Sequence, residues 1–406
     1  AQTQGSGIKL VDVLGGDGAS ALNAFRLGGP VAAGAFTYNL FRGGPQNPDG
    51  DWYLRTQAVV PPDPPVGPPT NPPTPPVPPV TPIPTYRPEA ALFAALPGFL
   101  RNIDAAVPGS RAARIGDEAG GLAVARRGRA WARYIRQDID TTQQGTVAPS
   151  VTGDTTGYQF GVELFGGKDE DAAQIGLYGG RLEGNAAVRG SSNGVANTLV
   201  GTLDPTITYA GVYVARSRGR GLYFDAVLQY GWYGGEASTL ADGEVAKIKG
   251  TGGYASLETG YGFAIVPSLV IEPQLQIVAQ PQRVHDLTIV NAQVVQDPAN
   301  TLMGRAGLRV KGDFGQPSWR LQPYVAVSIW QGLDHRDRTR FSGNGVTQTT
   351  LETYSELKAT ELAGGLSLGV GSRFVGFAEY SRLSSRGDPG MARDGNALSA
   401  GLRFAW

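Results

Sequence analysis

Twelve segments of about ten residues alternate between apolar and polar side chains, and this alternation constrains the fold more than any other feature. In one of them, Phe224, Leu228 and Trp232 share a face while Asp225 and Gln229 share the other. A period of two is the period of a β-strand, so each segment has one apolar and one polar face. The segments lie near 129–140, 157–166, 173–183, 206–216, 220–232, 251–265, 268–280, 302–312, 319–331, 359–370, 373–382 and 396–406.

The connections between these segments alternate in length. Long polar connections follow the odd-numbered segments, at 184–205, 233–250, 281–301 and 332–358, and short ones such as "SRGR" and "VPS" follow the even-numbered segments. A soluble β-sandwich has no reason to sort its loops in this way and would crowd charges on its outer face, whereas a transmembrane barrel has long loops at one end and tight turns at the other. The sequence therefore predicts an all-β fold, a twelve-stranded antiparallel transmembrane β-barrel.

The last segment supports this prediction. An even number of strands places both ends of the barrel on the short-turn side, so the last strand can close the barrel against the first. We expect aromatic side chains near strand ends to form interfacial girdles, at Trp131, Tyr158, Tyr230, Trp232 and Trp330. The apolar face of the last strand is formed by Leu398, Ala400, Leu402, Phe404 and Trp406.

Composition excludes several classes of function. The chain carries 35 basic and 35 acidic residues, so it lacks the basic excess of a nucleic-acid-binding surface. It has no cysteine, which excludes disulfides and the usual zinc sites, and its two histidines lie in connections. No run of about 18 apolar residues predicts a transmembrane helix. We predict no enzymatic activity, no catalytic, cofactor-binding or metal-ligating residue, and no cofactor.

Three different regions precede the barrel. Residues 1–57 contain strand-sized pieces such as "GAFTYNLFR", and residues 61–84 hold 14 prolines, the composition of a polyproline II linker. At about 3.1 Å per residue such a linker would reach roughly 75 Å. Residues 88–107 predict a helix that Pro97 and Gly98 kink or split. Because it carries Arg101 and Asp104, we expect it in a polar surrounding of membrane depth, the barrel lumen.

Charged residues on the polar faces are predicted to line this lumen. In the simpler interpretation, these residues form a solvated, charge-balanced pore wall. In a more specific interpretation, some of them hold the helix in place through Arg101. The candidates are Glu163, Asp225, Glu258, Glu272, Arg305, Arg309, Glu361, Glu379 and Arg403.

The order of these regions resembles the C-terminal half of a pertactin-like autotransporter, the monomeric type of type V secretion. Matching stretches include "AFRLGGPVAAGAFTYNLFRG" with "DWYLR", "GRAWARYIRQD", "IEPQLQIVAQ", "RAGLRVKGDF", "LQPYVAVSIWQGLD" and "LSAGLRFAW". The resemblance implies a translocator that anchors and exports its N-terminal passenger. It implies the end of a passenger β-helix with an autochaperone region at 1–60, a linker at 61–86, a helical segment inside the pore at 87–127 and the barrel at 128–406.

The resemblance also implies location and partners. The protein is expected as a monomer in the Gram-negative outer membrane, in contact with the lipid bilayer and lipopolysaccharide, with residues 1–60 exposed at the cell surface. Its partners would be the barrel assembly machinery, which engages the last strand, periplasmic chaperones and its own passenger segment. The bulk of the passenger is expected to lie outside these 406 residues.

Two other functions remain open from the sequence. One is a porin-like channel, although a porin needs neither the helix nor the linker. The other is a surface adhesin that acts through its extracellular loops, such as the one with the tripeptide Arg386, Gly387 and Asp388.

Overall fold

A closed barrel dominates the structure, a computed structural model that describes residues 2–16, 19–44, 49–58, 83–107, 109–116, 128–166, 173–218, 221–240, 243, 245–343, 346–371, 373–387 and 390–406. Within these ranges, twelve antiparallel strands follow one another around the wall, and the last strand pairs with the first. The predicted fold class and the closure by the C-terminal strand are therefore confirmed.

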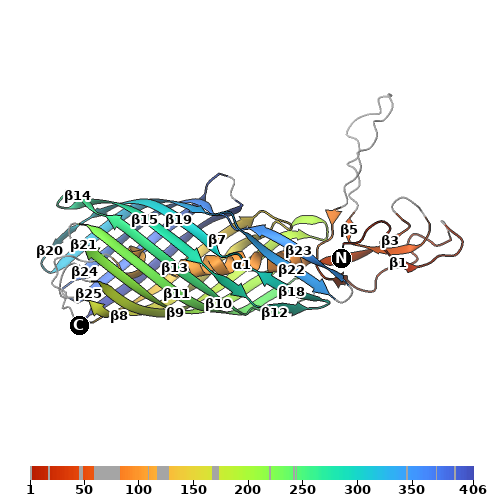
Figure 1. Ribbon diagram of the computed structural model, residues 1–406, viewed down its shortest axis with the longest axis horizontal. Helices are drawn as coiled ribbons and strands as arrows, with labels where there is room; N and C mark the ends of the chain where they lie inside the picture. The colour runs from red at the N-terminus through yellow and green to blue at the C-terminus, as the bar shows by residue number, and fades with distance from the viewer. Residues whose placement is uncertain are drawn as a thin grey trace, which may run out of the picture.

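The barrel strands are tilted and unequal in length (Figure 1). They are β7 (Arg129–Gln143), β8 (Ser150–Gly166), β9 (Gln174–Ser192), β10 (Val195–Arg218), β11 (Leu222–Thr239), β13 (Gly250–Tyr261), β15 (Leu269–Gln280), β19 (Thr301–Gly312), β21 (Trp319–Gly332), β24 (Lys358–Val370), β25 (Phe374–Ser385) and β26 (Met391–Ala405). Short strands extend their sheet: β12 (Val245–Lys247), β14 (Phe263–Val266), β16 (Gln282–Val284) and β20 (Phe314–Gln316). The end at which β26 finishes is called the short-turn end below, and the opposite end the mouth.

The predicted long loops at the mouth are largely strand. Most of 184–205 continues β9 and β10, which meet at a two-residue turn formed by Asn193 and Gly194, both with positive φ. Such a turn matches the twist of a hairpin, and asparagine and glycine tolerate it. Connections 281–301 and 332–358 contribute a small sheet, the mouth sheet, with the strand order β17 (Leu287–Ile289), β18 (Ala292–Asp297), β22 (Arg336–Gly343) and β23 (Val346–Tyr354).

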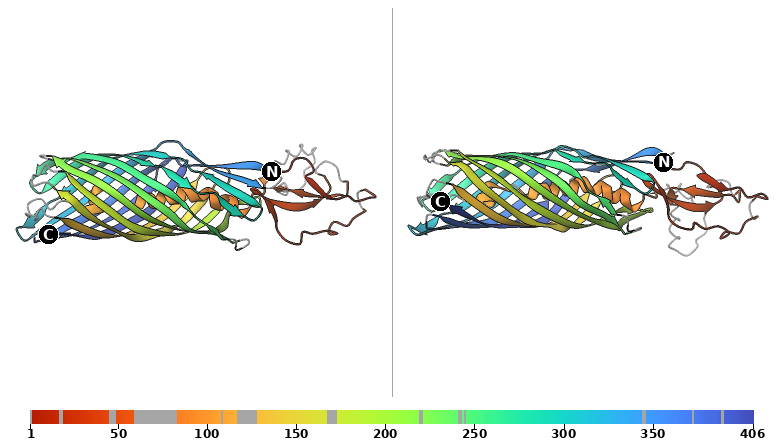
Figure 2. Two further views of the ribbon diagram at one scale, coloured as in Figure 1. Left: turned by 60° about the horizontal axis from the view of Figure 1, so that its bottom comes forward. Right: turned by 90° about the horizontal axis from the view of Figure 1, so that it is seen from below.

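The N-terminal region lies beyond the mouth (Figure 2). Its strands are β1 (Ile8–Val11), β2 (Val31–Ala33), β3 (Phe36–Arg42) and β4 (Trp52–Arg55), paired in the order β1-β4-β3-β2. All these pairings are antiparallel, and the predicted β-helix stays a prediction. Two further strands, β5 (Gln57–Ala58) and β6 (Ile83–Pro84), pair with each other. Most of the Pro-rich stretch, residues 59–82, lies outside the described residues.

Two helices follow β6. Helix α1 (Pro88–Ala106) begins with proline in its first turn, where the missing N–H costs no hydrogen bond, and Pro97 does not split it. Helix α2 (Arg111–Ile115) is capped by the Ser110 hydroxyl, which accepts a hydrogen bond from the Ala113 N–H. Among the described residues, no helix combines the length and the hydropathy that a membrane-spanning helix needs.

Candidate functional site: the occupied lumen

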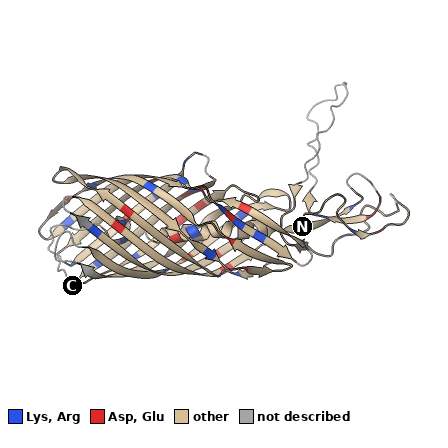
Figure 3. Cartoon of the chain, in the orientation of Figure 1, with Lys and Arg blue, Asp and Glu red and all other residues tan. Residues whose placement is uncertain are grey.

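The outer wall of the barrel carries an apolar band toward the short-turn end. On β26 the outward side chains from Leu398 to Trp406 are apolar, and the next ones toward the mouth are Asn396 and Asp394. On the paired strand β7, Tyr134 faces outward and is followed by Arg136 and then Asp138. Charged residues occur along the length of the barrel (Figure 3), and on β7 and β26 the outward ones lie on the mouth side of the apolar positions. The strands therefore continue beyond the part of the wall that fits hydrocarbon.

Two of the expected girdle aromatics point inward instead. Trp131 is 3% exposed and donates a hydrogen bond to the Tyr213 hydroxyl at 3.2 Å. Trp330 donates to Glu361 at 2.9 Å. Both occupy inward positions of the alternation, so they line the lumen, whereas Tyr230 and Trp232 face outward and are about half exposed.

The structure places the charged candidates on the inner face. Arg309 pairs with Glu272 of the neighbouring strand β15 at 3.2 Å, and Arg305 reaches past β15 to pair with Glu258 of β13 at 2.8 Å. Glu163 lies 3.4 Å from Arg129. Glu361 and Glu379 accept hydrogen bonds from the inward rings of Trp330 and Tyr324.

Helix α1 lies inside the mouth half of the barrel (Figure 1). Every residue from Glu89 to Asp104 is buried, as befits a helix that is apolar around most of its circumference. It packs mainly on β9 and β10, where glycine allows close approach: a Cβ at Gly190 would lie 2.5 Å from that of Ala91, and one at Gly184 would lie 2.8 Å from Ile103. Gly98 of α1 likewise allows close approach, because a Cβ at this position would collide with the side chain of Gln143. At the height of α1 the outer face of the wall is polar, which means that this part of the barrel extends beyond the apolar band. Helix α1 therefore lies nearer the mouth than the membrane depth at which we expected it.

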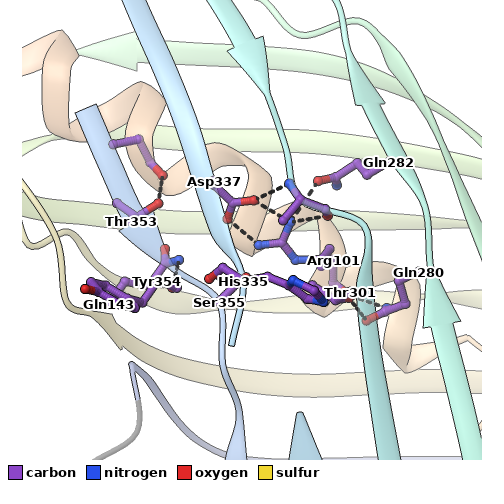
Figure 4. A network of polar contacts seen from close by, with 12 residues as sticks. Arg101, Gln143, Gln280, Gln282, Thr301, His335, Asp337, Thr353, Tyr354 and Ser355 are labelled. Carbon is purple, nitrogen blue, oxygen red and sulfur yellow. Dashed lines mark hydrogen bonds and ion pairs between the residues drawn. The ribbon is translucent and has the colours of Figure 1, made fainter. Parts of the chain in front are cut away.

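Arg101 is the centre of a buried polar network (Figure 4). Its guanidinium forms a bidentate ion pair with the carboxylate of Asp337 in the mouth sheet, in which Nη1 and Oδ1 are 2.9 Å apart. Asp337 also accepts a hydrogen bond from the Ala299 N–H at 2.8 Å, and Gln280 donates to the Arg101 carbonyl at 3.1 Å. The neighbouring helix carboxylate, Asp104, accepts a hydrogen bond from Tyr233. The mouth sheet is thereby fixed to the helix.

Helix α2 is held at the level of the apolar band. Arg114, fully buried, pairs with Asp225 at 2.5 Å and lies 4.9 Å from the centre of the Tyr213 ring. Arg403 donates to the Ile115 carbonyl at 3.0 Å, and Arg133 donates to the carbonyls of Ala113 and Val107. Cationic groups at these positions satisfy carbonyls that a helix C-terminus leaves without partners. We call α1 and α2 together the plug.

The plug leaves an open space on one side of the lumen. The cavity measures about 150 Å³ and lies between the plug and the wall from β13 through β26 to β7. Arg305, Arg309, Glu361 and Glu379 line it, together with Tyr324. These charged side chains can bind water, and the cavity is far larger than the space one water needs, so it can hold solvent.

Sequence reasoning identified part of this site. Of the predicted wall residues, Asp225 and Arg403 contact α2, and Glu379 lies 3.5 Å from Ser110. The partner of Arg101 was missed, because Asp337 lies in a connection 236 residues away with no local signal. Arg133 was also missed, although its inward position in the alternation of β7 could have indicated it.

Two further features of the sequence were considered as sites, the Arg-Gly-Asp tripeptide and a metal centre. The tripeptide that starts at Arg386 ends at Asp388, which lies outside the described residues. Across the described ranges, no cluster of three or more histidine, aspartate or glutamate side chains is arranged to hold a metal ion.

Comparisons with known proteins agree on one family. The family model for the autotransporter beta-domain matches residues 130–381, more than half of the chain. The chain is 30% identical over 373 residues to "Probable autotransporter YfaL" of Escherichia coli (strain K12), covering 87% of this chain and 28% of that protein. It is 26% identical over 329 residues to "Adhesin BmaC autotransporter" of Brucella suis biovar 1 (strain 1330), covering 76% of this chain and 9% of that protein.

The solved structures support the same fold. The transport unit of the autotransporter AIDA-I from Escherichia coli superposes with a TM-score of 0.54 at 15% sequence identity, covering 79% of this chain and 99% of that one. The chain spans less than a third of either curated relative, so it corresponds to one part of such proteins. With the closed barrel and the match over its strands, the chain belongs to the autotransporter family, and its barrel is the outer-membrane translocator domain.

Proposed function

We propose that the barrel exports and then retains its own passenger, and that the plug is the part of the chain that stays in the lumen when export ends. In this proposal residues 1–60 are the exported end of the passenger, residues 61–86 the linker, residues 87–127 the pore segment and residues 128–406 the translocator. The observation that supports it most is the continuity of the chain, which enters the lumen at the mouth as α1 and reaches the wall at β7 near the short-turn end.

The geometry of the plug supports retention after export. The Arg101–Asp337 and Arg114–Asp225 pairs are nearly inaccessible to solvent, so breaking either one leaves a charge buried without its partner. A chain that has reached this state is therefore held from both the mouth sheet and the barrel wall. The mouth end of the barrel would face the cell exterior, and the short-turn end the periplasm.

The proposal includes the partners expected from the sequence. The outward apolar face of β26, from Leu398 to Trp406, would be recognised by the barrel assembly machinery before it contacts lipid and lipopolysaccharide. Periplasmic chaperones would keep the chain unfolded before insertion, and the translocator would act as a monomer without enzymatic activity. The activity of the whole protein would reside in its passenger.

Conductance in planar bilayers tests the role of the plug. The full chain is expected to give small, flickering currents, because ions must pass beside the plug, for example through the side cavity. A variant that starts at Gly128 is expected to give a large and stable pore, since the lumen of a twelve-stranded barrel is wide enough to conduct once it is emptied.

Equal conductance of the two proteins would contradict the placement of the plug, and failure of both to insert would contradict the translocator function. A large conductance in both would favour the porin-like channel instead.

A further inference from the structure

The strip of chain that leads into α1, residues 83–87, is shared by the N-terminal region and the barrel. On one side, the Thr85 N–H donates a hydrogen bond to the Thr56 carbonyl at 2.8 Å, and the Thr85 carbonyl accepts a hydrogen bond from the Thr37 N–H at 2.9 Å. Phe36 and Tyr86 form an antiparallel bridge, and their rings stack with centroids 5.1 Å apart. The strip therefore completes the sheet structure of the preceding region.

Two hairpin turns of the barrel hold the other side of the same strip. The Asn193 N–H donates to the Tyr86 carbonyl at 2.8 Å. Arg87, whose side chain is buried, donates to the Val290 carbonyl at 2.9 Å. The turn that contains Val290 also contacts the N-terminal region directly, because the Gly34 N–H donates to the Asn291 carbonyl at 3.2 Å and the Asn291 amide donates to Ala32 at 3.3 Å.

Apolar packing continues across this junction. Ala35, Phe36 and Tyr38 belong to the same buried cluster as Leu92 and Phe93 of α1. Separating the two regions would expose these side chains to water, at a cost of about 25 cal/mol for each Å² of apolar surface. The contact therefore has an apolar centre as well as a rim of hydrogen bonds.

The residues that flank the Pro-rich stretch are neighbours in space. Ala58 pairs with Ile83, and Gln57 pairs with Pro84. Directly paired residues of antiparallel strands lie about 5 Å apart, whereas the 24 residues between Ala58 and Ile83 could span roughly 75 Å as polyproline II. A spacer that separates two domains would have its ends apart.

We propose that residues 31–44 and 49–58 dock on the mouth of the barrel as a fixed stem. The docking surface consists of strip 83–87 and the turns Asn193–Gly194 and Val290–Asn291, and its partner is the exported segment of the same chain. The Pro-rich stretch does not set the distance between passenger and barrel, and the base of the passenger keeps one orientation relative to the membrane. This inference rests on the proposed function only for the statement that the mouth faces the cell exterior.

Distances between two spin labels test the docking. The chain contains no cysteine, so Leu10→Cys on β1 and Val245→Cys at the mouth give a unique labelled pair, and both positions are half exposed. A docked stem is expected to give one narrow distance distribution in the full-length protein. An undocked stem on the 24-residue Pro-rich chain would instead give a broad distribution that extends to distances set by a reach of roughly 75 Å.

The Pro-rich stretch can be replaced without touching the docking surface. Substituting residues 59–82 by Asn-Gly joins Ala58 to Ile83 through a two-residue hairpin turn. The distance peak is expected to stay in place. A shifted or broadened peak would overturn the proposal, because it would show that the stretch determines the position of the stem.

A second variant separates docking from folding. Ala35 is fully buried and its carbonyl accepts the Arg87 N–H, so Ala35→Arg places a second cation in this contact and is expected to broaden the peak. The matched control is Ala24→Arg, the same change at an exposed position of the N-terminal region outside the stem, which is expected to leave the peak narrow. A narrow peak in Ala35→Arg would overturn the assigned surface.

Labelling on intact cells distinguishes this inference from the proposed function. Leu10→Cys is expected to react with a membrane-impermeant thiol reagent in every variant, because docking is not required for export. Surface labelling with a broad distance distribution would reject the docked stem alone. Lack of labelling of Leu10→Cys in the full-length chain that carries no other change would reject the proposed export itself.

Discussion

The pair formed by Arg114 and Asp225 is the most buried connection between the plug and the wall. Its side chains are 0% and 2% exposed. Replacing Arg114 by methionine leaves the Asp225 carboxylate buried without a counter-ion, which we expect to cost about 3–5 kcal/mol. The expected result is a lower midpoint of thermal unfolding, measured by circular dichroism in detergent.

The double variant Arg114→Met with Asp225→Leu provides the control. It removes both charges and keeps apolar bulk, so most of the lost stability is expected to return. If the double variant were as unstable as the single one, the loss would come from packing around Tyr213 and not from the unpaired charge.

Asp51 makes the N-terminal sheet sensitive to acid. Its pKa lies below the ordinary value, chiefly because it hydrogen-bonds to Lys9 and also because it accepts the Val13 N–H at 2.7 Å. Because its pKa is lower in the folded state, Asp51 stabilises the fold when the pH is above about 4, the pKa of an aspartate in the unfolded chain. This contribution is lost as the pH falls through the pKa that Asp51 has in the folded state. A spin label at Leu10→Cys should therefore become more mobile in acid.

Asp51→Asn is the comparison for this effect. The amide keeps a hydrogen-bond acceptor near Val13 but cannot titrate, so label mobility is expected to be raised already at neutral pH and to change little in acid. The same steep change with pH in both proteins would assign the transition to another group.

At the scale of elements, the position of α1 depends on small residues in β9. Gly190→Val would bring a side chain against Ala91, since even a Cβ would lie 2.5 Å away. Overpacking of this kind costs about 1–3 kcal/mol and is relieved by moving the helix. We expect larger and longer-lived currents in planar bilayers.

Gly304→Val on β19 is the matched control. This glycine lies on the outer face, and the nearest atom to an added Cβ is 4.0 Å away. Its current should match that of the unmodified protein. Unchanged currents in both variants would mean that the helix does not limit conductance at β9.

The sequence predicted the strands well where they face lipid and poorly where they face the plug. In the apolar band, outward side chains are apolar and inward ones polar, so a period of two is visible in short windows. Beyond the band this pattern inverts: on β9, Arg181 and Glu183 face outward while Leu182 and Val188 face α1. Residues 184–205 therefore resembled a polar loop. The site depends on contacts between distant residues, such as Arg101 and Asp337, which no local pattern indicates.

The whole molecule combines a band that matches hydrocarbon with a polar extension that contains the helix. On β26, Leu402 lies in the middle of the outward apolar row from Leu398 to Trp406 and is 69% exposed. Leu398 lies at the edge of this row, next to Asn396, and is 42% exposed. If the band marks the bilayer, these two positions lie at different depths in the membrane.

A charge on the lipid face should therefore cost more at one leucine than at the other. Arginine at the bilayer midplane costs about 2–4 kcal/mol and near the interface about 0–1 kcal/mol. Leu402→Arg is expected to lower folding stability in lipid vesicles by the larger amount and Leu398→Arg by the smaller, as measured by urea titration. Both variants keep the backbone pairing to β7, in which Leu402 opposes Ala132 and Leu398 opposes Arg136. Equal losses would show that the band does not mark the bilayer, and that helix α1 does not lie on the mouth side of the membrane.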